Sequence, residues 1–405
     1  MAILGILTLV IWGSWHYWLV GDLDPEALIR TDKEYTVTFW DFERPLSNGE
    51  SYKRELEREF ELFGREYPNI TIRPKLFSWA QSQQVATAIR KAQPHVVSLG
   101  PLDINDLDCD LLVPVTYLSA DELAGYLPLA RKSLDQESDI AVWPRFLAPQ
   151  LYLANVDLLQ AVGISCSTLQ ATGIGWSDIV YLGEKLSLLP ERPYVLAGLD
   201  YQGLLMAVAP RKVDGQPSGV ANWPPNAGES AACHIQELQA QGFMPADITP
   251  RDYSGLDSFF SGRAALLAPV EPWMMRTIRT RQQRIEHGLL DHEGASLHQM
   301  VLMPPKIAPD LGLSVRTEKM VVVKQRLPAD EVKAAVEWAR FLSRSGILAA
   351  KLDVLPTHNS ALEKWAAAWG LGNEAVLLKI CDHDIQLLPY PNTQLEGMAP
   401  SSRIE

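Results

Sequence analysis

The chain has 405 residues, of which 47% are hydrophobic and 21% are charged. A chain of this size and composition can build two or three domains with their own hydrophobic cores. The formal net charge of −13 argues against a polyanionic partner such as nucleic acid, because like charges repel.

The N-terminal segment from Ile3 to Val20 contains no Asp, Glu, Lys or Arg and is just long enough for a membrane-spanning helix. Aromatic residues crowd its C-terminal half, as is typical of a membrane interface: Trp12, Trp15, Tyr17 and Trp18. No small-x-small cleavage site stands out before the acidic stretch that follows. We therefore expect an uncleaved signal anchor that tethers an extracytoplasmic protein to the cell membrane. A cleaved signal peptide and a buried N-terminal helix remain alternatives.

Strands and helices alternate after a linker over residues 21–34. Tyr35–Trp40 has the β-branched and aromatic composition of a buried strand. Apolar residues at three- and four-residue spacing over Tyr52–Tyr67 predict an amphipathic helix that Pro68 ends. A strand over 70–72, a helix over 81–93 and a strand over 96–99 follow. This alternation predicts a parallel sheet with helices on its faces.

The same alternation continues along the chain. Ser119 and Glu122 form a capping box that begins another helix. Further strands or helices are expected over 152–162, 176–188, 194–197, 230–241, 264–268 and 320–323, and in a helix that begins at Pro328. Arg211–Gly228 is rich in Pro, Gly and Asn and predicts a long loop. The Pro-rich residues 389–405 predict an irregular tail.

Four separated segments carry a resemblance to a known family. They are Leu-Tyr-Leu-Ala-Asn-Val-Asp-Leu-Leu at 151–159 with Gly163-Ile164, Gly-Trp-Ser-Asp at 175–178, Phe-Ser-Gly-Arg-Ala-Ala-Leu at 260–266 with Trp273, and the helix over 333–341 with Leu355-Pro356. In this order and at this spacing they resemble the extracellular solute-binding protein family 1, whose best-known members bind maltose and other sugars.

The chain departs from the family pattern at several positions. Ala154 and Val156 replace a tyrosine and a lysine, and Glu271-Pro272 replaces the start of a Gly-x-Trp turn. No cysteine precedes Cys109, so the lipobox of bacterial lipoprotein members is missing. The anchor would then be a protein segment and not a lipid.

The resemblance implies an α/β fold of the periplasmic-binding-protein type II, with two hinged lobes and a ligand cleft between them. We expect lobe 1 to comprise residues 35–142 plus about 264–318, and lobe 2 to comprise 143–263 plus about 319–388. The implied function is the extracytoplasmic solute-binding component of an ABC import system. Its partners would be a small polar solute, first of all a sugar or oligosaccharide, and the ABC permease subunits.

Twelve tryptophans supply candidates for a sugar site, since indole rings stack on the C–H faces of sugars. Trp40 and Asp41 end the first strand, where a cleft residue should lie, and core packing is the alternative. Trp79 follows the second strand and can instead cover a sheet edge. Trp143 and Arg145 lie at the expected first crossing between the lobes, where they can serve hinge packing instead.

The remaining candidates lie in the second half of the chain. The resemblance places Trp273 where family members stack an aromatic ring on the ligand, with Glu271 beside it. Trp223 lies in the long loop. Asp200 and Tyr201 follow a strand and form either polar ligand contacts or a surface turn.

Enzyme motifs are absent from the sequence. There is no G-x-S-x-G elbow, no Walker loop and no C-x-x-C pair, and the histidines at 287, 292 and 298 lack a metal-ligand spacing. We therefore predict no catalytic residue, no metal and no cofactor, while one or two disulfides remain open. Two carboxylates can converge from any part of a chain, so a sugar-active hydrolase remains an alternative. Another is a sensory or scaffold module that kept the fold and lost transport.

Overall fold

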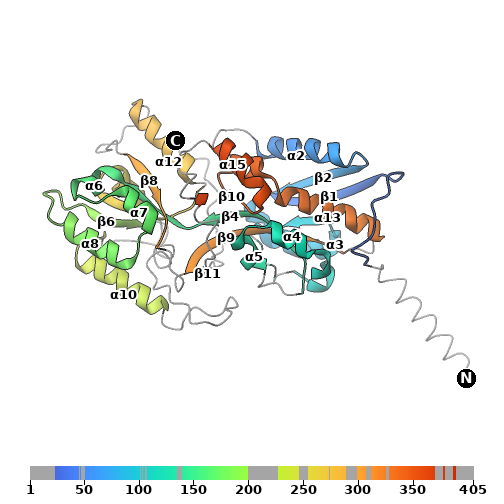
Figure 1. Cartoon of the computed structure of the whole chain (residues 1–405), viewed down its shortest axis with the longest axis horizontal. Coiled ribbons are helices and arrows are strands. Elements are labelled where there is room, and N and C mark those ends of the chain that lie inside the picture. Colours follow the sequence, from blue (N-terminus) through green and yellow to red (C-terminus); the bar gives the residue numbers. More distant parts are fainter. Residues whose placement is uncertain are drawn as a thin grey trace, which may run out of the picture.

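The structure is a computed structural model of the chain, drawn in Figure 1. It describes residues 23–44, 46, 51–100, 102, 104, 107–134, 139–198, 227–245, 254–272, 274–288, 299–306, 312–324, 328–369, 377–378 and 386–388. The predicted anchor over residues 3–20 lies outside these residues. Within the described part of the chain, no helix combines the length and the hydropathy needed to cross a membrane.

The larger of two sheets organises what we call lobe 1. Its seven strands are β1 (Tyr35–Phe42), β2 (Ile70–Phe77), β3 (Val96–Ser98), β4 (Val142–Pro149), β9 (Gly312–Val322), β10 (Leu355–Pro356) and β11 (Gln386–Leu388). They lie in the order β10-β4-β9-β3-β1-β2, and β11 pairs with β9 off this path. β1 is parallel to β2 and β3, whereas β9 is antiparallel to β3 and β4. The predicted parallel α/β segment is thus confirmed over β1 to β3.

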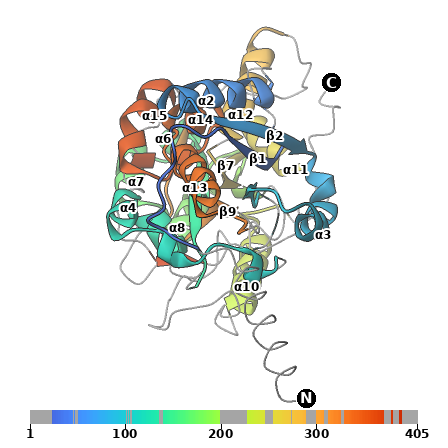
Figure 2. The same ribbon diagram turned by 90° about the vertical axis from the view of Figure 1, so that its right-hand side faces the viewer.

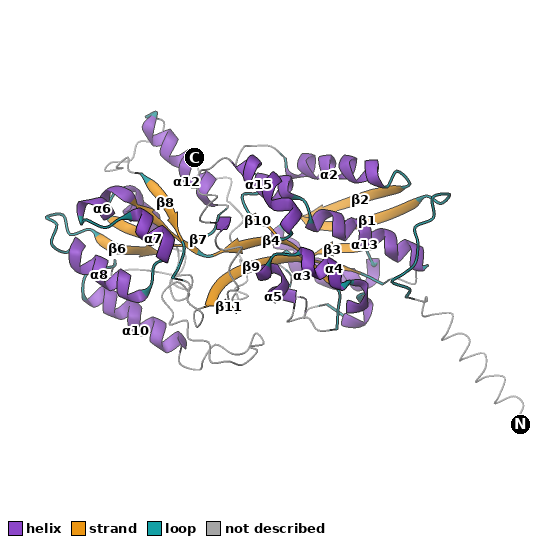
Figure 3. Cartoon of the chain, viewed as in Figure 1, coloured by secondary structure: helices purple, strands orange, loops and turns teal. Residues whose placement is uncertain are grey.

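The smaller sheet organises lobe 2. Its four strands are β5 (Leu151–Asn155), β6 (Tyr194–Gly198), β7 (Ala264–Val270) and β8 (Met300–Met303), in the order β6-β7-β5-β8. Figure 3 shows the two sheets at opposite ends of the molecule, with β4 and β9 extending from lobe 1 toward lobe 2. Gln150 alone separates β4 from β5, so the chain crosses between the sheets at this residue.

Helices follow the strands in both lobes. In lobe 1 they are α2 (Tyr52–Glu66), α3 (Ser82–Ala92), α4 (Ala120–Gly125), α5 (Pro128–Leu134), α13 (Ala329–Ser343), α14 (Gly346–Lys351) and α15 (Leu362–Trp369). Between β5 and β8 they are α6 (Val156–Ala161), α7 (Cys166–Thr172), α8 (Trp176–Leu186), α10 (Ala227–Ala240), α11 (Ser254–Phe260) and α12 (Met274–Glu286). Short 3₁₀ turns lie at Trp79–Gln81, Cys109–Leu111, Val115–Tyr117 and Asn359–Ala361.

An aromatic layer holds α2 and α13 on one face of the larger sheet. Trp338 of α13 meets Phe39 of β1 edge to face at 5.7 Å between ring centroids, and it meets Phe63 of α2 at 5.1 Å. All three side chains are buried, and burial of each contributes roughly 2–3 kcal/mol. Figure 2 shows lobe 1 from its free end, with both helices beside β1 and β2. This packing holds the first turn of α2 near the carboxyl end of β1.

Residues 23–34 form a strap on lobe 1, whereas the sequence predicted a linker there. Lys33 Nζ bonds the carboxylates of Asp330 and Glu331 at 2.9 and 3.0 Å, at the N-terminus of α13. Asn69 Nδ2 donates to the carbonyls of Arg30 and Lys33 at 2.8 and 2.9 Å. The strap is therefore tied to two elements of lobe 1, at the end of the molecule away from lobe 2 (Figure 1).

The division between the lobes differs from the predicted one. β7 and β8 were expected in lobe 1, but they pair with β5 in the sheet of lobe 2. The segment 319–388 was expected in lobe 2, but the end of β9 and the helices α13 to α15 belong to lobe 1. The first crossing lies at Gln150 and not at 142–143. These assignments depend on pairing between strands that lie more than a hundred residues apart in sequence. Local composition does not predict such pairing.

Candidate functional site

Six charged side chains and one tyrosine, all buried or largely buried, gather where the carboxyl ends of β1 and β3 meet β4 and β9. We call this set the junction network: Asp41, Arg44, Tyr52, Arg145, Glu271, Arg316 and Glu318. In open α/β sheets, ligand sites lie beyond the carboxyl ends of the strands. The junction network marks that edge of lobe 1 and reaches into lobe 2 through Glu271, so we take it as the framework of the candidate site.

Asp41 and Arg145 form the innermost ion pair, and both side chains are 0% exposed. Arg145 Nη1 donates to Asp41 Oδ2 at 2.8 Å, and Arg145 Nη2 donates to the Tyr52 hydroxyl at 2.7 Å. The Tyr52 hydroxyl in turn donates to Asp41. Arg145 is the extra residue of a bulge in β4, between the pairs that Pro144 and Phe146 make with β9. A bulge redirects a side chain, and here it turns the guanidinium toward Asp41.

Arg44 links this pair to Glu318 of β9. Arg44 Nη1 donates to Glu318 Oε1 at 2.6 Å, a second contact joins Nη2 to the other carboxylate oxygen, and Nη2 lies 4.0 Å from Asp41. The guanidinium also lies over the rings of Tyr52, Trp79 and Phe146, at 5.8, 6.0 and 5.6 Å from the centroids. Such cation–π contacts stabilise a guanidinium that is buried away from water.

The arginines of the network hold two of its acids, Asp41 and Glu318, in the ionised form. Burial alone would raise the pKa of Asp41, but Arg145 and Arg44 outweigh it and hold that pKa below its ordinary value. Burial likewise opposes ionisation of Glu318, and Arg44 and Arg316 hold its pKa below the ordinary value. Burial and the nearby Asp41 raise the pKa of Tyr52, against the pull of Arg145 and Arg44. A glycosidase needs a carboxylic acid of raised pKa as proton donor, and neither Asp41 nor Glu318 meets that need.

Arg316 carries the network across to lobe 2. Its Nη1 lies 3.3 Å from Glu318 Oε1 and its Nη2 donates to Glu271 Oε2 at 2.8 Å. Arg316 lies on β9 of lobe 1, and Glu271 directly follows β7 of lobe 2. Both side chains are largely buried, with 18% and 10% exposure. The alternation of three arginines with three acids therefore ends on a contact between the lobes.

Of the three predicted tryptophans that lie within the described residues, Trp79 is the one that is not fully buried. It lies in the turn after β2, and its indole N–H donates to the Glu43 carbonyl at 2.7 Å. Its ring is half-buried beside Phe42, at 6.3 Å between centroids, and beside Arg44. An indole fixed in this way at the carboxyl edge of the sheet can stack on the apolar face of a sugar.

Trp40 and Trp143 are core residues in this structure. Trp40 packs edge to face on Phe77 at 5.0 Å, and the Lys75 ammonium covers its ring at 4.9 Å. Trp143 is 0% exposed, and its indole N–H donates to Glu122 at 2.9 Å. Neither ring has a free face for a ligand, which agrees with the core-packing alternative for Trp40. For Trp143 the alternative was hinge packing, and its ring lies in the core beside Glu122. Asp41 and Arg145 pair with each other, and both side chains are fully buried, so they shape the candidate site without an exposed surface of their own.

The other predicted site residues are Trp273, Trp223, Asp200 and Tyr201, and they lie outside the described residues. Their ligand contacts stay predictions. Among the residues that the structure does describe, no three His, Cys, Asp or Glu side chains are placed to hold a metal ion.

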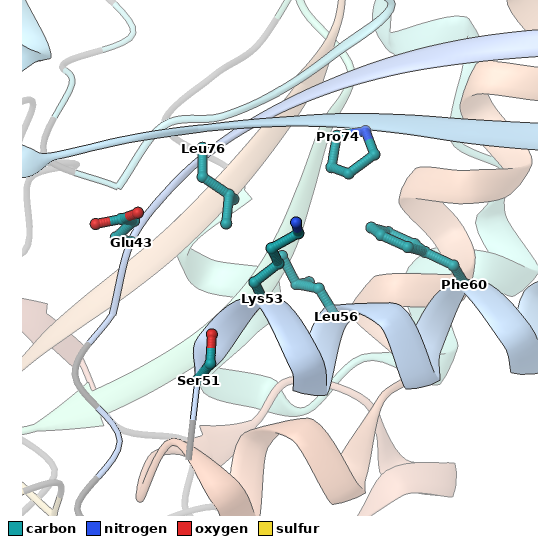
Figure 4. Close-up of a pocket in the computed structure, with 7 residues that line it drawn as sticks. All are labelled: Glu43, Ser51, Lys53, Leu56, Phe60, Pro74 and Leu76. Carbon is teal, nitrogen blue, oxygen red and sulfur yellow. The ribbon is translucent and has the colours of Figure 1, made fainter. Parts of the chain in front are cut away.

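A separate pocket of about 320 Å³ lies between α2 and β2. Figure 4 shows its walls, with apolar side chains from both elements, Lys53 in the middle, and Glu43 and Ser51 toward one side. The apolar residues are Leu56, Phe60, Pro74 and Leu76. β2 is the edge strand of the larger sheet, so this pocket lies on the flank of lobe 1 and apart from the inter-lobe contact of Arg316 with Glu271.

Sequence reasoning missed Arg44, Tyr52, Arg316 and Glu318. Arg316 and Glu318 were detectable in part, because charged residues directly precede the apolar run 320–323 of an expected buried strand. A charge inside a buried strand needs a partner, which is itself a signal of a polar site. Arg44 and Tyr52 gave no such signal, since they lie in a turn and at a helix start, where polar groups are ordinary.

No protein-family model and no curated protein matches the sequence. Solved structures do match it. The sugar-binding protein MalE from Xanthomonas citri has a TM-score of 0.66 at 16% identity, over 87% of each chain. The GacH receptor of Streptomyces glaucescens, solved unliganded and with acarbose, has a TM-score of 0.58 at 16% identity, over 88% of each chain. The cyclic α-maltosyl-1,6-maltose binding protein of Arthrobacter globiformis has a TM-score of 0.61 at 13% identity, over 88% of each chain.

The chain has the fold of these binding proteins. The predicted fold class, α/β with two lobes of the periplasmic-binding-protein type, is thereby confirmed over nearly nine tenths of the chain. In this binding-protein fold the junction network occupies the edge where lobe 1 meets lobe 2. At 13–16% identity these matches establish the fold alone.

Proposed function

We propose that this protein is the solute-binding component of an ABC import system. It captures a small polar solute, first of all a sugar or oligosaccharide, by closing its hinged lobes, and it delivers that solute to a membrane permease without covalent chemistry. The observation that carries the proposal is the match in fold, over both lobes, to a sugar-binding protein, a cyclic α-maltosyl-1,6-maltose binding protein and a receptor solved with acarbose. Trp79 also supports the proposal, because its half-exposed ring lies at the carboxyl end of β2 in lobe 1, where it can stack on such a ligand.

The proposed location is the extracytoplasmic face of the cell membrane, with residues 3–20 as the tether. The support is the absence of charged residues from that segment and its C-terminal aromatic residues. Fractionation of cells that express the full chain tests this part. Recovery in the membrane fraction at high salt supports the tether, release by a signal peptidase supports the cleaved alternative, and a cytoplasmic protein contradicts export.

Thermal unfolding of the full chain in the presence of sugars, amino acids and polyamines tests the function. A ligand that binds only the folded state stabilises it by RT ln(1 + [L]/Kd), which is about 2.7 kcal/mol at a hundredfold excess over Kd. We expect one or more oligosaccharides to raise the Tm by several degrees. Trp79→Ala should reduce that rise. Trp176→Ala is the matched control. Trp176 lies in α8 of lobe 2 and stacks on His234, with 3.9 Å between the ring centroids, so this variant should keep the rise in Tm.

Other outcomes point to the alternatives. Stabilisation by amino acids or polyamines alone would change the solute class and keep the binding function. Turnover of a glycoside would favour a sugar-active hydrolase. No stabilisation by any solute would favour a sensory or scaffold module that has lost transport.

A further inference from the structure

We propose that Arg316 and Glu271 form an inter-lobe latch that sets the resting angle between the lobes. The pair joins β9 of lobe 1 to the end of β7 of lobe 2 at 2.8 Å. Hinged proteins populate more than one lobe arrangement, and a contact that exists in only one of them shifts the population toward it. The latch consists of this chain's own residues, so its effect on the lobe angle can be tested without a solute.

Charge balance gives the latch its strength. Along the junction network, Glu318 lies between Arg44 and Arg316, and Asp41 lies between Arg44 and Arg145. Glu271 supplies one of the three negative charges that face the three arginines. If lobe 2 moves Glu271 away, the 2.8 Å contact with Arg316 is lost in a region that is largely shielded from water.

The rest of the network keeps Arg316 in position for this contact. Glu318 is nearly fully buried on the same strand, two residues from Arg316, and its other partner Arg44 is held by three aromatic rings. The lobe 1 side of the latch is thus preorganised, so little side-chain entropy is lost when Glu271 arrives. The lobe 2 side is equally defined, because Glu271 directly follows β7, which pairs with both β5 and β6.

Exposed cysteines on the two lobes allow the angle to be measured without a ligand. Cys109 of lobe 1 and Cys233 of lobe 2 are exposed, so spin labels on them report the distance between the lobes. Cys166→Ser and Cys381→Ser remove the remaining thiols and serve as the parent. Glu271→Gln keeps the shape of the side chain and removes its charge. Glu337→Gln is the matched control, since Glu337 is a similarly buried partner of Lys333 and Arg340 within lobe 1.

We expect a single dominant Cys109–Cys233 distance in the parent at low salt. Glu271→Gln should raise the population at other distances about fivefold, the effect of losing one partly buried ion pair. Molar salt should broaden the parent distribution in the same direction and change Glu271→Gln much less. Arg316→Gln should resemble Glu271→Gln, and circular dichroism should show that each variant is folded. An unchanged distribution in Glu271→Gln, or the same broadening in Glu337→Gln, would overturn the latch.

The effect on solute affinity rests on the proposed function, and it is measured separately. The latch can hold the lobes away from the arrangement that binds solute, and its loss then lowers the apparent Kd. If it holds the lobes in that arrangement, its loss raises the apparent Kd. A changed distance distribution with no solute found would support the latch and count against the binding function. An unchanged distribution with a solute found would do the reverse.

Discussion

At the scale of single residues, the junction network shows how this protein carries charge in its interior. An unpaired buried carboxylate costs several kcal/mol, and a paired one is tolerated when its hydrogen-bonding capacity is filled. Asp41 accepts bonds from Arg145, from Tyr52 and from the backbone N–H of Phe42. Removal of the Asp41 carboxylate therefore lowers the stability of the fold by more than the loss of one ion pair, because the fully buried Arg145 keeps its charge.

We predict that Asp41→Asn lowers the free energy of unfolding by about 3–5 kcal/mol, the usual cost of leaving a buried charge uncompensated. Urea unfolding followed by circular dichroism measures the difference. Asp32→Asn is the control, since Asp32 forms an exposed pair with Arg30 and its loss should leave stability unchanged. An Asp41→Asn variant as stable as the wild type would contradict the paired, ionised state of Asp41.

The pH dependence of the stability difference between wild type and Asp41→Asn tests whether Asp41 is ionised in the folded protein. The pKa of Asp41 is lower in the folded protein than in the unfolded chain, where it is about 4. Its stabilising contribution is therefore complete above that unfolded value and disappears as the pH falls through the folded value. The gap in stability between wild type and Asp41→Asn should be full at neutral pH and should narrow below about pH 4.

At the scale of elements, the strap over residues 23–34 behaves as part of lobe 1. Leu23 and Ile29 pack against the core, and Lys333 Nζ donates to the Pro25 carbonyl at 3.2 Å. The strap thus covers the N-terminus of α13, where Lys33 meets two acids. Residue 23, the first residue that the structure describes, therefore lies on lobe 1.

We predict that deleting residues 1–34 lowers the free energy of unfolding by roughly 1–3 kcal/mol relative to deleting residues 1–22. The reason is the loss of two half-buried aliphatic side chains and of the Lys33 contacts with Asp330 and Glu331. Thermal or urea unfolding of the two shortened chains gives the comparison. Equal stabilities would mean that residues 23–34 are a linker, as first expected from the sequence.

At the scale of the whole molecule, one hydrophobic core runs through the junction. Leu147 and Val321 of lobe 1 belong to the same buried cluster as Leu153 and Leu267 of lobe 2, and a second cluster lies within lobe 2 alone. The two lobes therefore share buried contacts next to the crossing at Gln150. Such sharing couples the stability of one lobe to that of the other.

We predict that the protein unfolds in one main calorimetric transition without ligand, because separating the lobes would expose the shared core. The measurement is differential scanning calorimetry with comparison of the calorimetric and van't Hoff enthalpies. Two well-separated transitions would show that the lobes unfold independently.

Much of the local structure was predictable from the sequence. The strand expected over 35–40 is β1, the helix expected from Tyr52 is α2, and the Ser119 hydroxyl caps α4 by accepting from the N–H of Glu122 at 3.1 Å. These features depend on side-chain period, on caps and on turn residues, which are all set within a few positions. The order of the four family-like segments further determined the two-lobed fold class.

Only the tertiary structure decided which strands share a sheet and which charges meet. Arg145 lies 104 residues from Asp41 in sequence and Arg316 lies 45 residues from Glu271. The first pair meets within the larger sheet, and the second pair meets where the two sheets approach each other. The bulge at Arg145 is a shift of register between β4 and β9, and no local pattern announces it. Composition identified the tryptophans, but their exposure depends on what packs against each ring. For this reason the fold class and most elements followed from the sequence, whereas the lobe boundaries and the junction network required the folded chain.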